Sequence, residues 1–253
     1  MPIVNLVTYT GAGTPDPKFE AARLLAFTKN TRLQMTPDGM KKFSNMEEKD
    51  LLDELDYMSK TIPSSWEFAD VVFLITRVSR ATAQQVTRSR HATFAMQSQR
   101  VTDVSEASWD NPYDIFSQPG EPERERFEMF ERAMKASVDR YKALLCEDAT
   151  LEDARDVLPV GLHCNIVAKY NLRSLSELVR ARKSLRVQGP YRDIIVQMES
   201  LVTGIWPWSE GFFKPKNEIA LKMLEEIAVE LGEGGAMYKG VSGKLAKAVD
   251  LLK

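Results

Sequence analysis

The sequence of 253 residues contains only two cysteines, Cys146 and Cys164, and only two histidines. Neither a CxxC pair nor a Cys/His cluster with the spacing of metal ligands accompanies them, which argues against a zinc site. Two isolated cysteines also argue against a disulfide framework. We therefore expect two reduced thiols and a cytoplasmic location.

Long apolar runs and an excess of one charge are also missing. No stretch approaches the roughly 20 apolar residues that a membrane-spanning helix needs, and no signal sequence is apparent. The formal net charge is -2, so the chain as a whole attracts neither nucleic acid nor an anionic membrane. We predict no nucleic-acid or membrane partner, and any phosphate binding must come from a local cluster of arginines.

The hydrophobic content of 43% is enough to bury a full core at this length, and we expect one domain over residues 1–253. Apolar and alternating runs predict strands at residues 3–9, 69–75 and 161–170. A short helix with Ser79 as its N-cap should follow the second strand and carry Gln85. Helical periodicity predicts longer helices at residues 19–28, 46–59, 123–148 and 174–201.

One segment of the chain is dense in side chains that donate hydrogen bonds. Arg88, Arg90 and Arg100 lie within thirteen residues, with Gln85 upstream and Ser98 between them. Guanidinium groups are fork-shaped donors that suit phosphate and the edge of a heterocycle. The alternative, solvated surface charge, does not account for their order and spacing. The segment therefore predicts a nucleotide site.

A second candidate is an arginine in the helix predicted at residues 174–201. At 100° per residue, Arg182 falls within an apolar stripe, so we expect it to face inward. The stripe consists of Leu175, Leu178, Val179 and Leu185. An inward guanidinium needs a carboxylate, a ligand or another chain as its partner. A structural ion pair, or a side chain that bends outward to solvent, remains an alternative.

The arginine-rich segment resembles the signature of the flavin-dependent thymidylate synthases, the ThyX family, which reads Arg-His-Arg-x-x-Ser-x-Asn-x-x-Ser-x-Arg-Tyr. The frame of that signature is kept at Arg88, Arg90, Ser98 and Arg100. Four positions differ, with Ser89 in place of His, Thr93 of Ser, Ala95 of Asn and Val101 of Tyr.

The chain also resembles a second block of the same family, Arg-x-x-Leu-Pro…Asn-x-Arg-Ser-Leu…Arg. The matching residues are Arg155, Leu158, Pro159, Asn171, Arg173, Ser174, Leu175 and Arg182. The two blocks occur in the family's order, and the resemblance covers about residues 60–200. Outside these blocks, Glu67 and Phe68 replace a familiar Glu-His pair, and Glu177 stands where Asn is often found.

The resemblance implies an α+β fold: a single domain with a central, mostly antiparallel sheet flanked by long helices. It also implies FAD as cofactor, NADPH and methylenetetrahydrofolate as co-substrates, a pyrimidine deoxynucleotide monophosphate as substrate, no cysteine nucleophile, and a homotetramer whose sites combine subunits. The implied cofactor-binding residues are Ser65, Arg88, Ser89, Arg90, Asn171, Arg173 and Glu177. The implied substrate-binding residues are Gln85, Arg88, Met96, Gln97, Ser98, Gln99, Arg100, Arg155 and Arg182.

Of these residues, the resemblance implies that Arg182 has the catalytic role. It would contact the pyrimidine and favour its ionised form, because a cationic donor stabilises negative charge that develops in the ring.

Three functions are compatible with these residues. The first is reductive methylation of dUMP to dTMP. The second is a ThyX-like hydroxymethylase acting on dUMP or dCMP, because the loss of polar groups at Ser89 and Ala95 can alter substrate choice and outcome. The third is a non-catalytic homologue whose arginines only bind the phosphate of a nucleotide or nucleic acid. The near-neutral net charge argues against a nucleic-acid surface.

Overall fold

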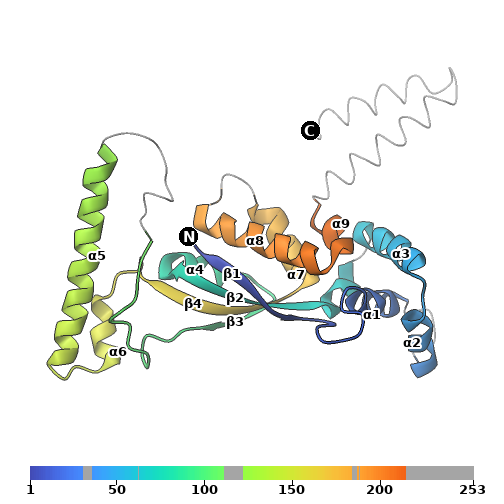
Figure 1. Ribbon diagram of the computed structural model, residues 1–253, viewed down its shortest axis with the longest axis horizontal. Coiled ribbons are helices and arrows are strands. Elements are labelled where there is room, and N and C mark those ends of the chain that lie inside the picture. The colour runs from blue at the N-terminus through green and yellow to red at the C-terminus, as the bar shows by residue number, and fades with distance from the viewer. Residues whose placement is uncertain (31–35, 62, 111–121, 184–186, 188, 215–253) are drawn as a thin grey trace, which may run out of the picture.

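The computed structural model describes residues 1–30, 36–61, 63–110, 122–183, 187 and 189–214. An antiparallel sheet of four strands, in the order β1-β2-β4-β3, lies at its centre (Figure 1). The strands are β1 (Ile3–Tyr9), β2 (Asp70–Ser79), β3 (Ala92–Met96) and β4 (His163–Asn171). The predicted α+β fold with an antiparallel sheet is confirmed, as are the strands expected near residues 3–9, 69–75 and 161–170.

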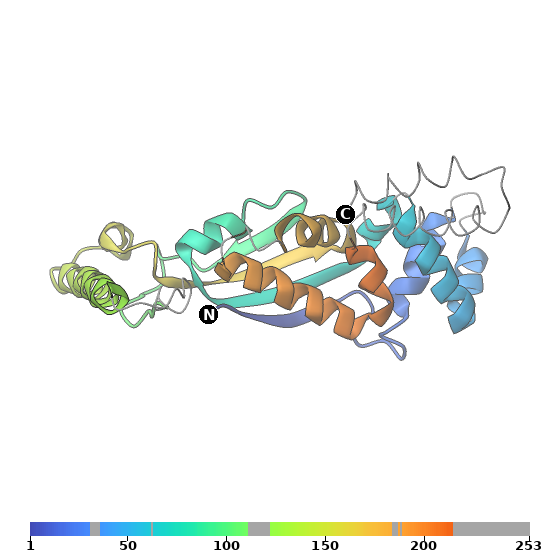
Figure 2. The ribbon, with the colours of Figure 1, turned by 90° about the horizontal axis from the view of Figure 1, so that it is seen from above.

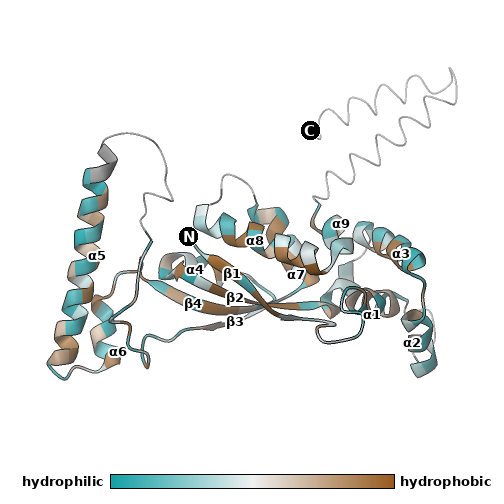
Figure 3. Ribbon diagram, in the orientation of Figure 1, coloured by the Kyte–Doolittle hydropathy of each residue, from teal (hydrophilic) through white to brown (hydrophobic). Residues whose placement is uncertain are grey.

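The sheet is covered on one face because its strands alternate in polarity. In β4 the even-numbered side chains from Cys164 to Tyr170 are buried, whereas Asn165, Val167 and Lys169 are exposed. The buried face packs against α7 (Leu172–Arg182) and α8 (Gly189–Ile205), which lie side by side over the sheet (Figure 2). Hydrophobic residues accordingly gather in the strands and in these helices (Figure 3).

Most of the remaining helices lie at the two ends of the sheet (Figure 1). At one end are α1 (Glu20–Lys29), α2 (Pro37–Ser44), α3 (Glu48–Lys60) and the 3₁₀ helix η1 (Pro63–Phe68). At the other end are α5 (Pro122–Cys146), α6 (Leu151–Ala154) and the 3₁₀ helix η3 (Arg155–Val157). The short η4 (Pro207–Ser209) and α9 (Glu210–Phe213) follow α8. In the part of the chain described, no helix combines the length and apolarity needed to cross a bilayer.

The single helix predicted at residues 174–201 is wrong, because two helices occupy this part of the chain. The first, α7, ends at Arg182, and α8 begins at Gly189. The reason is Pro190, which has no N–H to donate and whose ring clashes with a preceding helical turn. A proline is tolerated in the first turn of a helix, which is where Pro190 lies in α8.

The short helix predicted after the second strand is confirmed as α4 (Arg80–Val86). The Ser79 hydroxyl caps it by accepting a hydrogen bond of 3.2 Å from the Thr82 N–H. Such a cap satisfies one of the backbone donors that the first turn leaves unpaired. It fixes where β2 ends and how the chain enters the arginine-rich segment.

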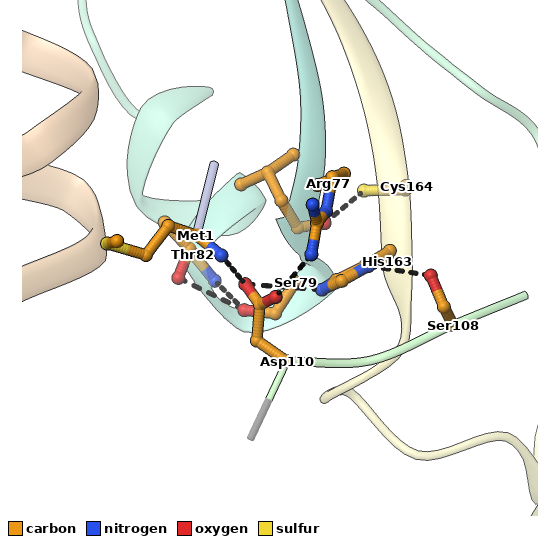
Figure 4. Close-up of polar contacts among 9 residues, drawn as sticks. Met1, Arg77, Ser79, Thr82, Ser108, Asp110, His163 and Cys164 are labelled. Atoms are coloured by element: carbon orange, nitrogen blue, oxygen red, sulfur yellow. Dashed lines mark hydrogen bonds and ion pairs between the residues drawn. The ribbon is translucent and has the colours of Figure 1, made fainter. Parts of the chain in front are cut away.

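Polar contacts link the segment that ends at Asp110 to strands β2 and β4 (Figure 4). The Asp110 carboxylate lies 3.3 Å from the Arg77 guanidinium and 3.4 Å from His163 Nε2. The Ser108 hydroxyl lies 3.0 Å from His163 Nδ1. Arg77 has a φ of 55°, at an irregularity in the pairing of β2 with β4. Burial lowers the pKa of His163, and this effect outweighs the opposing influence of Asp110.

The lowered pKa of His163 predicts a loss of stability on mild acidification. The unfolded chain takes up the proton more readily than the folded one, so the free energy of unfolding should fall as the pH drops below about 6.5. His163→Gln should remove much of the difference between about pH 7.5 and about pH 5.5 in urea denaturation, while the exposed His91→Gln should keep it. An unchanged pH dependence in His163→Gln would contradict this assignment.

Candidate active site

The pairing of β3 with β4 sets the geometry of the candidate site. The strands are antiparallel, with Ala92 opposite Tyr170 and Met96 opposite Ile166. Residues just before β3 therefore lie beside residues just after β4, at what we term the α7 end (residues 88–91 and 171–173). Residues just after β3 lie at the opposite end of the same strand pair, termed the α6 end (residues 97–100 and 152–155).

The turn from α4 into β3 forms the first part of the α7 end. It carries Arg88, Ser89 and Arg90, and His91 closes it with a φ of 58°, in the left-handed region. Arg88 and Arg90 are exposed. Among the described residues, no carboxylate lies within ion-pair distance of either guanidinium. Both groups are therefore able to bind an anion without first breaking a protein contact.

The start of α7 forms the second part of this end. Asn171 is the N-cap, and its side-chain oxygen accepts a 2.8 Å hydrogen bond from the Ser174 N–H. Arg173 donates to Glu177 at 3.2 Å and to Glu67 at 2.6 Å. These hydrogen bonds raise the pKa of the guanidinium. Arg173 is thus held in place by two carboxylates, while about 40% of its side chain stays exposed.

Ser89 differs from its two arginine neighbours because its hydroxyl oxygen is buried. The hydroxyls of Ser89 and Tyr170 are close enough to influence each other, yet neither completes a well-aligned hydrogen bond within the described residues. Burial raises the pKa of Tyr170, and the Ser89 hydroxyl lowers it to a smaller extent. A buried hydroxyl without a well-aligned partner costs stability. Ser65, the other serine predicted to bind the cofactor, is also buried and lies in η1.

A cavity of about 530 Å³ opens along α4 beside this turn. It brings two of the predicted substrate-binding residues, Gln85 and Arg88, into one concave surface. Its volume lies within the range of about 300–1,000 Å³ that is typical of small-molecule sites. The described residues that line it are Ala81, Gln84, Gln85, Thr87 and Arg88.

The α6 end holds most of the other predicted substrate-binding residues. The Gln97 N–H donates to the Asn165 carbonyl at 2.9 Å, which extends the pairing by one residue beyond β3. The Arg100 N–H then donates to the Ser98 hydroxyl at 3.2 Å in a tight turn. Gln99 is buried, and its amide nitrogen has no partner in the described part of the chain. Met96, just before this turn, is 40% exposed.

Two arginines from different blocks of the sequence meet at this end. Arg100 Nη1 and Arg155 Nη2 each lie 3.8 Å from Oε1 of Glu152. Thr150 positions this segment by capping α6, since its hydroxyl accepts from the Asp153 N–H at 3.1 Å. Sequence analysis did not identify Glu152, although its spacing of three residues from Arg155 is one at which helical side chains are neighbours.

The prediction that Arg182 faces inward is wrong within this chain. The apolar stripe itself is present, because Leu175 and Val179 are buried and Leu178 is partly buried. Arg182, however, is the last residue of α7 and is exposed. The helix does not continue past it, so no further turn covers its side chain. Leu185 lies outside the described residues.

Most of this chain is similar to proteins that are already known. The sequence profile of the family described as "Thymidylate synthase complementing protein" matches residues 5–208. A flavin-dependent thymidylate synthase of Geobacter sulfurreducens is 34% identical over 198 residues, which cover 77% of this chain and 81% of that protein. One from Pyrococcus abyssi is 30% identical over 132 residues, covering 52% of this chain and 54% of the relative.

Among solved structures, the chain is similar in fold to the crystal structure of the UMP/dUMP methylase PolB from Streptomyces cacaoi bound with 5-Br dUMP. The TM-score is 0.65 at 18% sequence identity, and the match covers 84% of this chain and 94% of that chain. At this identity the likeness concerns the fold alone.

Variants of Asn171 should separate its structural role from a role in cofactor binding. Asn171→Ala removes the cap of α7 and should lower the free energy of unfolding by about 1 kcal/mol. Asn171→Asp keeps the acceptor, so it should remain as stable as the wild type, but its negative charge should repel cofactor phosphates. Urea denaturation and flavin absorbance of the purified proteins measure the two effects. An aspartate variant with full flavin content would show that Asn171 lies away from the cofactor.

Proposed function

The chain belongs to the thymidylate synthase complementing protein family, and on this premise we propose that it is a flavin-dependent thymidylate synthase that converts dUMP to dTMP. The curated relatives carry the name flavin-dependent thymidylate synthase, which supports a flavin cofactor and methyl transfer. In the proposed reaction, methylenetetrahydrofolate supplies the carbon and NADPH supplies the reducing equivalents through FAD. A cytoplasmic location fits two free thiols.

The observation that carries the proposal is the convergence of two sequence blocks at the α7 end. Arg88, Ser89 and Arg90 come from one block, and Asn171 and Arg173 come from the other. Exposed guanidiniums that have no carboxylate partner among the described residues fit the phosphates of FAD. When bound, FAD supplies the redox chemistry, and the protein supplies orientation and charge. Ser65 and Glu177 complete the proposed cofactor set, Glu177 through Arg173.

The nucleotide is proposed to bind through residues from both ends of β3. Arg100 and Arg155 would hold its phosphate, and Arg88 and Arg182 would reach the rest of the molecule. Arg182 would stabilise negative charge that develops in the pyrimidine ring. The remaining members of the proposed substrate set are Gln85, Met96, Gln97, Ser98 and Gln99.

The cysteines fit a reaction without a thiol nucleophile. Cys164 is buried and donates a 3.4 Å hydrogen bond to the Val78 carbonyl. Burial raises the pKa of its thiol, which disfavours the reactive thiolate. Cys146 is exposed at the end of α5, a helix packed against α6 and η3.

The split of the nucleotide set supports a site shared between copies of the chain. Arg88 belongs to the α7 end, with Gln85 beside it in the cavity along α4, whereas Ser98 and Arg100 belong to the α6 end. The α carbons at the two ends of β3 are about 13 Å apart at ~3.3 Å per residue, so the two groups of side chains lie at separate ends of the strand. The resemblance to the family implies a homotetramer, and we propose that the α7 end of one subunit faces the α6 end of another.

A pyrimidine nucleotide hydroxymethylase is the second candidate function. It is favoured by the altered signature, in which Ser89 replaces an imidazole and Ala95 an amide. Glu177, where an amide is common, contacts Arg173 instead. A non-catalytic nucleotide-binding homologue is the third candidate, and the absence of bound or added flavin in the pure protein would favour it.

The product distinguishes the first two functions. With dUMP, methylenetetrahydrofolate, FAD and NADPH, we expect the protein to add a methyl group at carbon 5, because family membership favours reductive methylation. Mass spectrometry of the nucleotide, repeated with dCMP, measures the added group. A hydroxymethyl product would overturn the thymidylate synthase assignment and establish the second candidate.

Three arginine variants should separate flavin binding from turnover. Arg90→Ala should lower flavin occupancy, because it removes a donor to the cofactor phosphates, and Arg88→Ala should do the same. Arg182→Ala should abolish turnover while FAD stays bound, because its proposed contact is with the pyrimidine. Visible absorbance and release of tritium from carbon 5 of labelled dUMP measure the two properties. Full flavin content in Arg90→Ala, or wild-type turnover in Arg182→Ala, would contradict the assignment concerned.

A further inference from the structure

A single carboxylate oxygen stands between the two arginines of the α6 end. Oε1 of Glu152 lies 3.8 Å from Arg100 Nη1 and 3.8 Å from Arg155 Nη2. The arginines come from segments more than fifty residues apart in the sequence, so only the fold brings them to this shared point. A phosphate bound by both guanidiniums would have to place an oxygen in the same region.

The contacts of Glu152 are ionic rather than hydrogen-bonded. A separation of 3.8 Å is beyond hydrogen-bond range, so the guanidinium donors are not consumed by the carboxylate. The Arg173 guanidinium, in contrast, donates to Glu67 at 2.6 Å. Glu152 and Arg100 are also largely exposed, with side-chain accessibilities of 54% and 60%. An exposed pair of this kind contributes little to stability, so another anion can displace it at low cost.

We propose that Glu152 is an internal counter-ion that occupies the phosphate subsite when no nucleotide is bound and sets the affinity for the phosphate monoester. This inference rests on the proposed function, in which Arg100 and Arg155 hold the nucleotide phosphate. Without a ligand, Glu152 offsets the repulsion between two adjacent positive charges. A phosphate monoester carries a larger negative charge and forms charge-assisted hydrogen bonds with both forks, so it displaces the single carboxylate.

The same arrangement makes the subsite selective. A singly charged anion interacts with the two guanidiniums little better than the carboxylate that it must replace. A phosphate monoester binds them more strongly, because it carries more negative charge and accepts more hydrogen bonds. Glu152 therefore lowers the absolute affinity for every anion and favours the one that uses both guanidiniums. Removing its charge should tighten phosphate binding and weaken this discrimination.

Calorimetry on the FAD-loaded protein at low, fixed ionic strength tests the proposal. Glu152→Gln keeps the shape of the side chain and removes its charge. We expect this variant to bind dUMP about three- to fivefold more tightly than the wild type, within the range that an exposed ion pair supports. Inorganic phosphate should compete more strongly in the variant, while binding of deoxyuridine, which has no phosphate, should not change.

Asp156 provides a matched control. Its carboxylate lies 4.0 Å from Arg155 Nε and makes no ion pair with Arg100 among the described residues. Asp156→Asn therefore removes one charge of the same sign nearby without vacating the shared position, and dUMP binding should change less than about twofold. An equal gain in Glu152→Gln and Asp156→Asn would show that only net charge matters and would overturn the proposal.

Two further outcomes are separable. If Arg100→Ala and Arg155→Ala each bind dUMP as the wild type does, the proposed nucleotide site is wrong. The proposed role of Glu152 is then also wrong, because it depends on that site. If both arginine variants lose binding but Glu152→Gln binds dUMP equally or more weakly, the site stands. In that case Glu152 orients the arginines instead of competing with the phosphate, and the proposal is overturned.

Discussion

The antiparallel register of β3 against β4 is the constraint on which the rest of the site depends. With Ala92 opposite Tyr170, the arginine turn before β3 is brought to the start of α7, more than eighty residues later in the sequence. The same register sends Arg100 to the opposite end of the strand pair, beside Arg155. A shift of one residue would turn every side chain of β3 to the other face of the sheet and separate these groups.

The arginines at the two ends of the strand pair differ in their carboxylate partners. At the α7 end, Arg88 and Arg90 have no carboxylate partner among the described residues, while Arg173 is fixed by hydrogen bonds to two glutamates. At the α6 end, one carboxylate oxygen of Glu152 forms ion pairs with two arginines but accepts a hydrogen bond from neither. Although the net charge of the chain is -2, arginines therefore gather at both ends of the β3–β4 strand pair. Both places are suited to anionic ligands.

Sequence analysis predicted the features that depend on local signals. Alternation in β4, the Ser79 cap and the arginine turn each lie within a few residues, so periodicity and side-chain chemistry identify them. It failed at the break between α7 and α8, because apolar periodicity continued across Pro190 and outweighed it. The wrong prediction that Arg182 faces inward follows from that error. The contact of Glu67 with Arg173 joins residues 106 positions apart, and no local pattern marks it.

The central claim is that a complete site combines the α7 end of one subunit with the α6 end of another. Mixed assemblies of Arg90→Ala and Arg100→Ala subunits test it most directly, because each variant alone damages every site. Random pairing should restore about one quarter of the sites and hence measurable dTMP formation. A chain carrying both substitutions, mixed with either single variant, should restore none. Mixed assemblies that form, as shown by mass spectrometry, yet remain inactive would contradict the account.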